Sequence, residues 1–278
     1  MPAYLTHRVA GEMVLDKLPE AVANKHAFFL GCQGPDILFF RDFQPWRAPM
    51  KSLRLGLRMH QERVRDLFFA ALEYARQYED ADRDELIAYL TGFITHYAVD
   101  KNTHPFVYGK AGGNTSLHNR IELMWDSFAA KEKWGIEPQQ FDIYSDIMDE
   151  KVGEGICGCY SAVAKEVYGK RMGGSAVPRA QKYFARIKAR LVDINRFGRI
   201  LIRVIRALSG FDVGAMMYPE RRSEQWFSRE EYQGMQDMLQ KGVDEACDMI
   251  RVALEFISGG EVALPGWFGD TDFSGDPI

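Results

Sequence analysis

Apolar residues in this chain recur at intervals of three and four over long segments, and this spacing constrains the fold more than any other feature. Between residues 52 and 78 such positions include Leu53, Leu57, Val64 and Leu67. The same spacing recurs between residues 84 and 100, whereas alternation of apolar and polar residues is almost absent. Intervals of three and four place side chains on one face of an α-helix. The sequence therefore predicts an all-α, multi-helix bundle with one long helix over 52–78 and another over 84–100.

Further helices are predicted on both sides of these two. Thr6 is expected to cap a helix that contains His7, and another helix is expected to begin near Leu117. In the C-terminal half we expect helices over 154–168, 178–208 and 229–258, followed by an irregular tail from residue 259. His104 directly precedes Pro105. Because the residue before a proline avoids the helical conformation, His104 is expected to lie in a loop after the second long helix.

The composition is that of a folded protein without disulfides. The chain has 278 residues, of which 46% are hydrophobic, so it can bury a large core. We divide it into a helical segment of residues 1–170 and C-terminal helices of residues 171–278, packed together as one continuous unit. The four cysteines match no zinc-finger or redox spacing and are expected to be reduced. No signal peptide or membrane-spanning stretch is recognisable, so we expect a cytoplasmic protein.

Five of the six histidines fall in one ordered run with carboxylates, within the first 122 residues. Two pairs in this run are four residues apart, so each pair shares one face of a helix. Such a pair can offer an imidazole nitrogen and a carboxylate oxygen to the same metal ion. The sixth histidine, His26, has no carboxylate at a useful offset and is interpreted as an ordinary helix residue. The run consists of His7, Asp36, His60, His96, Asp100, His104, His118 and Glu122.

A metal site explains this set better than eight independent roles do. Taken singly, each histidine is more often a core or surface residue with an ordinary hydrogen-bond partner. Taken together, on the inward faces of apolar helices, they would be costly to bury unless they were satisfied jointly, as metal coordination does. Zinc takes imidazole and carboxylate ligands, and one tetrahedral ion uses only four, so we predict a multinuclear zinc site with about two to three ions.

The order of these motifs resembles the zinc-dependent phospholipases C of bacteria, whose all-α fold and tri-zinc site are shared with the single-strand-specific zinc nucleases. The resemblance spans residues 1–170 and is most specific in residues 34–37 (GPDI), 92–100 (GFITHYAVD) and 118–122 (HNRIE). It implies that one zinc ion is surrounded by Asp36, His60, His96 and Asp100. It further implies that Asp100 bridges to a second ion bound by His7, and that His104, His118 and Glu122 hold a third.

The resemblance also implies an activity. It is that of a metal-dependent phosphodiester hydrolase, most closely of the phospholipase C type, which uses zinc-activated water on a phosphodiester or phospholipid. Asp36 is the candidate to orient or deprotonate that water. A nuclease-like phosphodiesterase and a metal-binding scaffold without turnover are the alternatives. Phe39, Phe40, Phe43 and Trp46 could contact lipid chains or stack on bases, although aromatic residues beside a bundle are more often part of the core.

One basic segment stands out in a chain whose net charge is −4. Residues 179–206 contain nine Lys or Arg and a single acid, Asp193, while their apolar residues keep helical spacing. We interpret the segment as a packed helix whose basic face pairs with the acidic remainder of the chain. The alternative is peripheral docking on an anionic membrane, with nucleic acid as the less favoured partner. The sequence contains no feature that indicates an oligomeric state.

Overall fold

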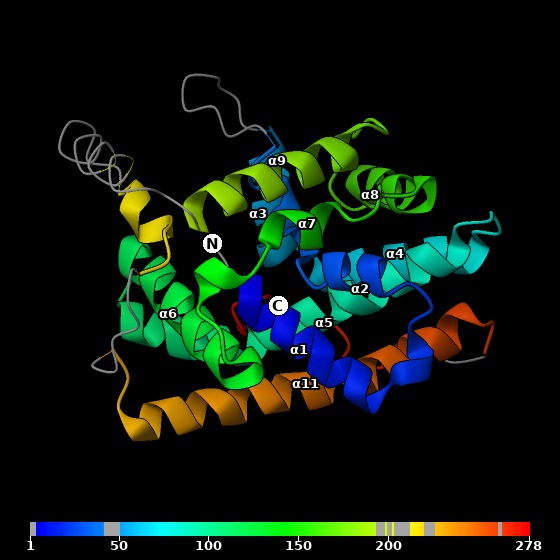
Figure 1. The fold of residues 1–278 in the computed structure, drawn as a ribbon. Coiled ribbons are helices and arrows are strands. Elements are labelled where there is room, and N and C mark those ends of the chain that lie inside the picture. Colours follow the sequence, from blue (N-terminus) through cyan, green and yellow to red (C-terminus); the bar gives the residue numbers. More distant parts are fainter. Residues whose placement is uncertain are drawn as a thin grey trace.

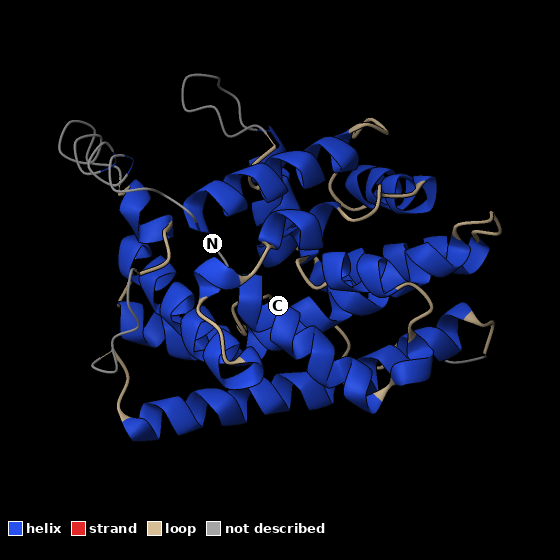
Figure 2. Ribbon diagram, in the orientation of Figure 1, coloured by secondary structure: helices blue, strands red, loops and turns tan. Residues whose placement is uncertain are grey.

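Every regular element in the described part of the chain is a helix (Figure 1; Figure 2). The structure is a computed structural model that describes residues 4–41, 51–192, 198, 202, 212–219, 226–260 and 263–278. Its α-helices are α1 (Tyr4–Lys17), α2 (Lys25–Gly31), α3 (Lys51–Gln61), α4 (Val64–Gln77), α5 (Arg83–Ala111), α6 (Thr115–Trp134), α7 (Ile143–Met148), α8 (Glu154–Glu166), α9 (Ala176–Val192) and α11 (Arg229–Ile257). Its 3-10 helices are η1 (Pro19–Ala21), η2 (Gly34–Leu38), η3 (Pro138–Gln140) and η4 (Val213–Met216). In these residues the only β-structure is an isolated bridge between Thr271 and Pro277, so the predicted all-α fold is confirmed.

Helix α5 is the central element of the bundle. It contacts α1, α2, α4, α6, α8 and α11, and α11 packs extensively against it. From Leu86 to Asp100 every residue except Ile87 is buried. Apolar side chains lie on all sides of this part of the helix, as expected for a helix surrounded by others. His96 and Asp100 are therefore enclosed in the interior of the molecule.

Helices α2 and α5 approach so closely that both need glycine at the contact. A Cβ atom at Gly92 would lie 2.0 Å from the carbonyl oxygen of Phe28, and one at Gly31 would lie 2.1 Å from that of Tyr89. No side chain fits in so narrow a space, and glycine has none. The contact brings the end of α2 beside His96, whose Nδ1 lies 3.1 Å from the carbonyl oxygen of Cys32.

The segment predicted as one helix over 52–78 is two helices, α3 and α4, so this prediction was wrong in detail. The chain turns at Arg63, whose φ of 55° is left-handed and incompatible with a continuous helix. The Arg63 side chain donates a hydrogen bond to the carbonyl of Val167 at 2.5 Å, and the Tyr168 hydroxyl donates to that of Glu62 at 3.0 Å. Both helices bury apolar faces, so the apolar spacing continues through the break and does not reveal it.

The prediction that His104 lies in a loop was also wrong, because α5 continues through Pro105 to Ala111. The proline removes the N–H group that would bond to the carbonyl of Lys101. The C-terminal tail packs against this position: a Cβ atom at Gly275 would lie 2.7 Å from that carbonyl oxygen. Packing on both sides of α5 outweighs the local cost of an interior proline, which is about 3 kcal/mol. His104 therefore lies one turn after Asp100 on the same helix face.

The predictions for the remaining helices and for the C-terminal tail are confirmed in part. Thr6 is not a cap, because α1 already includes Tyr4 and the Thr6 hydroxyl donates to Asp126. Helices α8 and α11 match the predicted helices over 154–168 and 229–258, and the tail after residue 259 is irregular. Helix α9 covers the first half of the predicted helix over 178–208, whose remainder, except residues 198 and 202, lies outside the described residues. No described helix combines the length and apolar character needed to cross a membrane.

Candidate metal centre

All eight residues of the histidine and carboxylate run meet in one region of the bundle. They come from α1 (His7), η2 (Asp36), α3 (His60), α5 (His96, Asp100 and His104) and α6 (His118 and Glu122). Seven are buried, and the side chain of His60 is only 13% exposed. Their potential ligand atoms form three groups, in each of which the atoms lie within 4.8 Å of one another. The groups are His7 with His96 and Asp100, Asp36 with His60 and His96, and His104 with His118 and Glu122.

Asp100 presents its two oxygens to two different histidines. Its Oδ1 lies 3.1 Å from Nε2 of His7, and its Oδ2 lies 3.2 Å from Nε2 of His96. The centres of these two imidazole rings are 4.3 Å apart. A carboxylate that directs one oxygen to each side can join two neighbouring cations.

Several buried polar atoms of the centre are close to one another without being hydrogen-bonded. Oδ1 of Asp36 lies 3.0 Å from Nε2 of His60, yet neither oxygen of Asp36 forms a properly aligned hydrogen bond with a described residue. The same holds for Nε2 of His96 and Oδ2 of Asp100. Buried polar atoms in this state are costly unless another group satisfies them. Imidazole nitrogen and carboxylate oxygen are zinc ligands, so this set of atoms fits zinc.

Glu122 connects two histidines that come from different helices. Its Oε1 lies 3.1 Å from Nε2 of His104 on α5 and 3.0 Å from Nε2 of His118 on α6. His104 also approaches Asp100, with 3.8 Å between Nδ1 and Oδ2. This third group is therefore continuous with the other two along the face of α5.

Backbone carbonyl groups orient three of the histidine rings. In each case the carbonyl oxygen faces Nδ1, and an N–H at that position leaves the lone pair of Nε2 free for a metal. Nε2 is also the atom that faces the carboxylates, so the rings are oriented as metal ligands require. The pairs are His60 with Gly56 at 2.7 Å, His96 with Cys32 at 3.1 Å and His104 with Phe273 at 2.7 Å.

Burial and the neighbouring carboxylates have opposite effects on the pKa values of the histidines: burial lowers them, and the carboxylates raise them. Burial lowers the pKa of His96 to about 4, so this ring is neutral at neutral pH. Burial also disfavours the charged form of His104, but Asp100 and Glu122 outweigh it and raise its pKa to about 9. Burial alone would raise the pKa values of the Asp100 and Glu122 carboxyl groups. Neighbouring positive groups, which include the histidines, outweigh burial and hold both pKa values below their usual range. A metal ion at His104 would therefore have to displace a proton.

Asp126 on α6 anchors the beginning of α1, a role that was not predicted from the sequence. Its carboxylate accepts hydrogen bonds from the backbone N–H groups of Leu5 at 3.0 Å and Thr6 at 2.6 Å, and from the hydroxyl groups of Thr6 and Tyr218. It thus satisfies N–H groups that have no partner within α1 and fixes the turn that contains His7. Its offset of four from Glu122 was the available signal, since that places both acids on one helix face.

Lys188 on α9 is a buried basic residue near the carboxylates of the centre. Among the described residues it is the one buried Lys or Arg side chain. Burial lowers the pKa of Lys188, while the nearby carboxylates of Asp126, Asp36 and Glu122 oppose that shift. In the sequence, nothing in the spacing of Lys188 separates it from the exposed basic residues around it, so its burial could not be predicted.

The aromatic residues next to Asp36 belong to the core where they are described. Phe40 is 1% exposed, and the ring of the buried Phe39 stacks on that of His60 with 5.2 Å between centroids. These two residues therefore offer no surface to lipid chains or bases. Phe43 and Trp46 lie outside the described residues.

A family model described as Zinc dependent phospholipase C matches residues 1–166, which is more than half of the chain. The chain belongs to the zinc-dependent phospholipase C family. No curated protein and no solved structure matches it significantly. The part that matches the zinc-dependent phospholipase C family includes all eight residues of the run and ends at the last residue of α8. Helices α9 and α11 and the C-terminal tail follow it.

Proposed function

We propose that this protein is a zinc-dependent hydrolase of phosphodiesters, with phospholipids as its substrate class. The observation that carries the proposal is the convergence of eight potential ligands in three linked groups, in a chain of this family. His96 serves a single ion, because its Nδ1 faces the Cys32 carbonyl and only Nε2 remains. We assign Asp36, His60, His96 and Asp100 to one ion, Asp100 and His7 to a second, and His104, His118 and Glu122 to a third.

The residues of the chain have separate parts in the proposed reaction. Bound zinc supplies Lewis acidity, which stabilises charge on the phosphate oxygens and lowers the pKa of a coordinated water. We assign Asp36 to orient or deprotonate the attacking water, since it is almost fully buried and its oxygens form no aligned hydrogen bond with a described residue. We assign Lys188, a buried basic residue near the carboxylates of Asp36 and Glu122, to attract the phosphate group when its amine is protonated.

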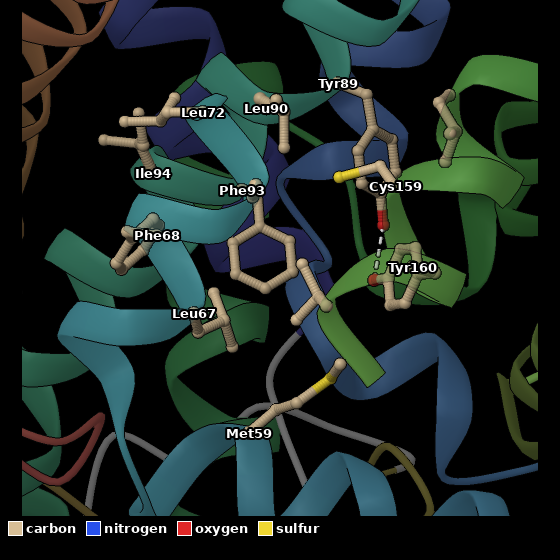
Figure 3. A pocket seen from close by; sticks show the side chains of 13 residues that line it. Met59, Leu67, Phe68, Leu72, Tyr89, Leu90, Phe93, Ile94, Cys159 and Tyr160 are labelled. Atoms are coloured by element: carbon tan, nitrogen blue, oxygen red, sulfur yellow. Dashed lines mark hydrogen bonds between the residues drawn. The ribbon is translucent and has the colours of Figure 1, made fainter. Parts of the chain in front are cut away.

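The acyl chains of a phospholipid would remain outside the described bundle. An apolar cavity lies between α3, α4, α5 and α8, with Met59, Phe93 and Tyr160 among the side chains around it (Figure 3). The volume of this cavity is only about 20 Å³, which suffices for about one water molecule. This cavity is therefore too small for an acyl chain, and we propose that the lipid tails stay in the membrane while the headgroup reaches the centre.

The exposed basic residues of α9 support the alternative partner that the sequence suggested, an anionic membrane. Arg179, Lys182, Arg186 and Arg190 are exposed on α9, the helix that also contains Lys188. Exposed basic residues are attracted to anionic lipid, each by about 1 kcal/mol when close to the surface. Helix α9 contacts η2, which contains Asp36, so membrane docking through α9 would bring the lipid headgroups to the side of the bundle next to this part of the proposed site.

Hydrolysis assays test the proposed function against its alternatives. The purified protein is incubated with phosphatidylcholine, a soluble aryl phosphodiester and a single-stranded oligonucleotide, before and after chelation and again after zinc is restored. We expect zinc-dependent release of phosphocholine from phosphatidylcholine. Preferential cleavage of the oligonucleotide would support a nuclease-like enzyme instead. A protein that binds zinc but hydrolyses none of the three would be a metal-binding scaffold.

A further inference from the structure

The C-terminal tail forms a compact turn that is anchored to the bundle. Thr271 and Pro277 form an antiparallel bridge across this turn. The carboxylate of Asp272 accepts hydrogen bonds from the backbone N–H groups of Ser274 at 2.7 Å and Asp276 at 3.0 Å. These bonds give the turn a defined shape of its own.

Two side chains of the bundle attach the tail to α4 and α5. Arg65 on α4 donates hydrogen bonds to the carbonyl groups of Pro265 at 3.1 Å and Gly266 at 2.8 Å. The hydroxyl of Tyr97 on α5 donates to the carbonyl of Thr271 at 2.9 Å. The ring centroid of Tyr97 lies 5.0 Å from that of Phe273, which in turn lies 5.7 Å from that of His96, so the second attachment lies beside the metal centre.

Phe273, within the turn, reaches the centre through its backbone and its ring. Its N–H donates to the carbonyl of His60 at 3.0 Å, and its carbonyl oxygen lies 2.7 Å from Nδ1 of His104. Its ring centroid lies 4.7 Å from that of His60 and 5.7 Å from that of His96. The side chain of Phe273 is 1% exposed. One residue of the tail therefore contacts three of the proposed ligands.

We propose that Phe273 is a positioning residue of the metal centre and that the C-terminal tail is part of the site. Its carbonyl holds the His104 ring with Nε2 directed at Glu122, and its ring packs His60 and His96 against the bundle. The inference rests on the proposed function, because it takes these histidines as zinc ligands. The carbonyl partners of His60 and His96 lie within residues 1–166, whereas that of His104 lies in the tail.

The physical consequence concerns metal affinity. Without the Phe273 carbonyl, Nδ1 of His104 loses the acceptor that fixes its tautomer, and the ring can turn away from Glu122. Loss of such an outer partner lowers metal affinity by about 10- to 100-fold. The third group, which contains His104, should be affected most.

Gly275→Ala tests the proposal without altering any proposed ligand. Gly275 has a φ of +84°, and a Cβ atom there would lie 2.7 Å from the Lys101 carbonyl oxygen, so the tail must shift. Gly259→Ala is the matched control, because Gly259 has a φ of +87° and nothing within 4 Å of an added Cβ. Tyr97→Phe is a milder second variant, which removes only the hydroxyl bonded to Thr271.

Zinc stoichiometry and affinity are measured by titration against a chromogenic chelator, and the visible spectrum of the cobalt-substituted protein reports the coordination geometry. We expect Gly275→Ala to lower the affinity for the most weakly bound zinc ion by about tenfold or more and to change the spectrum of the cobalt-substituted protein. Tyr97→Phe should have a smaller effect in the same direction, and Gly259→Ala should have none. If Gly275→Ala fails to fold, Tyr97→Phe against wild type decides.

The outcomes separate this inference from the proposed function. If wild type binds zinc and hydrolyses phosphatidylcholine while both tail variants bind zinc like wild type, the tail is not part of the site and only this inference fails. If wild type binds no zinc, both the proposed function and this inference are wrong. If Gly259→Ala loses zinc as strongly as Gly275→Ala, the effect comes from backbone strain, and the inference is overturned.

Discussion

His96 occupies the most enclosed position in the metal centre. Its side chain is 0% exposed, and a Cβ atom at Gly34 would lie 2.2 Å from its ring. The Cys32 carbonyl fixes Nδ1, and burial keeps the pKa low enough for a neutral ring at neutral pH. Its Nε2 therefore has a free lone pair directed toward Asp100, at 3.2 Å. Position, tautomer and charge of this residue are all those of a metal ligand.

His96→Ala should remove most of the bound zinc and of the hydrolytic activity, because the proposed first ion loses a central ligand. His26→Ala is the control, since His26 lies on α2 outside the three ligand groups and its Nε2 accepts a hydrogen bond from the Glu150 backbone N–H at 3.3 Å. Zinc content and phosphatidylcholine hydrolysis are measured for both variants. Equal damage from His26→Ala would contradict this sorting of the histidines.

Zinc affinity should depend on pH through His104. Its pKa of about 9 in the metal-free protein means that zinc displaces a proton at pH 7, so affinity should rise by up to about tenfold per unit until the pH exceeds about 9. The same proton stabilises the metal-free fold, and that contribution is complete below pH 6.5 and lost as the pH rises through about 9. Chelator competition across this range measures the slope. His104→Gln should reduce it, and an unchanged slope in that variant would assign the proton to another group.

At the scale of elements, the contact between α2 and α5 sets the position of the centre. Gly92→Ala would place a Cβ atom 2.0 Å from the carbonyl oxygen of Phe28, so the helices must separate. We expect a loss of about 1–3 kcal/mol or more in the free energy of unfolding, together with weaker zinc binding. Gly109→Ala, on the same helix with nothing within 4 Å, should instead stabilise by about 0.5–1 kcal/mol. Urea denaturation measures the free energy of unfolding of both variants. Equal values would show that the contact between α2 and α5 tolerates a methyl group.

The elements that sequence could predict are those determined by local spacing. The apolar faces of α5, α6, α8 and α11 and the two pairs at an offset of four could be read directly, because both follow from the helical repeat. The turn at Arg63 could not, since it depends on bonds to Val167 and Tyr168 more than 100 residues away. The continuation of α5 through Pro105 likewise depends on the distant Gly275 and on packing by α11. Local rules failed wherever a distant segment supplied the stabilising contact.

The same division holds for the candidate site. The eight potential ligands could be named from sequence because their residue types and order are distinctive. Their supports could not, since Asp126, Lys188 and Phe273 are ordinary residues until the fold places them. The backbone carbonyls that orient the rings have no side-chain signature at all.

Much of the structure that surrounds the centre lies beyond the matched residues 1–166. Helix α11 packs along α5, and a Cβ atom at Gly242 would lie 2.9 Å from the Cα atom of Val99, so the two helices meet near Asp100. Helix α9 supplies Lys188, and the tail supplies Phe273. The C-terminal helices and tail thus enclose a centre whose proposed ligands all come from the family region.

The exposed face of α9 should bind anionic vesicles at low salt. Replacement of Lys182 and Arg186 by Gln should weaken sedimentation with phosphatidylserine vesicles, since each basic residue contributes about 1 kcal/mol near the surface. Added salt should weaken it further by screening. The matched control replaces Lys241 and Arg251 on α11, which lies at the opposite side of the view in Figure 1. Absence of wild-type binding at low salt would make the basic face a solvated surface.

The metal content of the purified chain shows whether the eight residues form a multinuclear zinc centre. Eight potential ligands exceed the four that one tetrahedral ion uses, so elemental analysis after zinc-replete expression should find about two to three zinc ions per chain. The ions should be lost on chelation and return when zinc is restored. Fewer than about one ion per chain under these conditions would contradict the account.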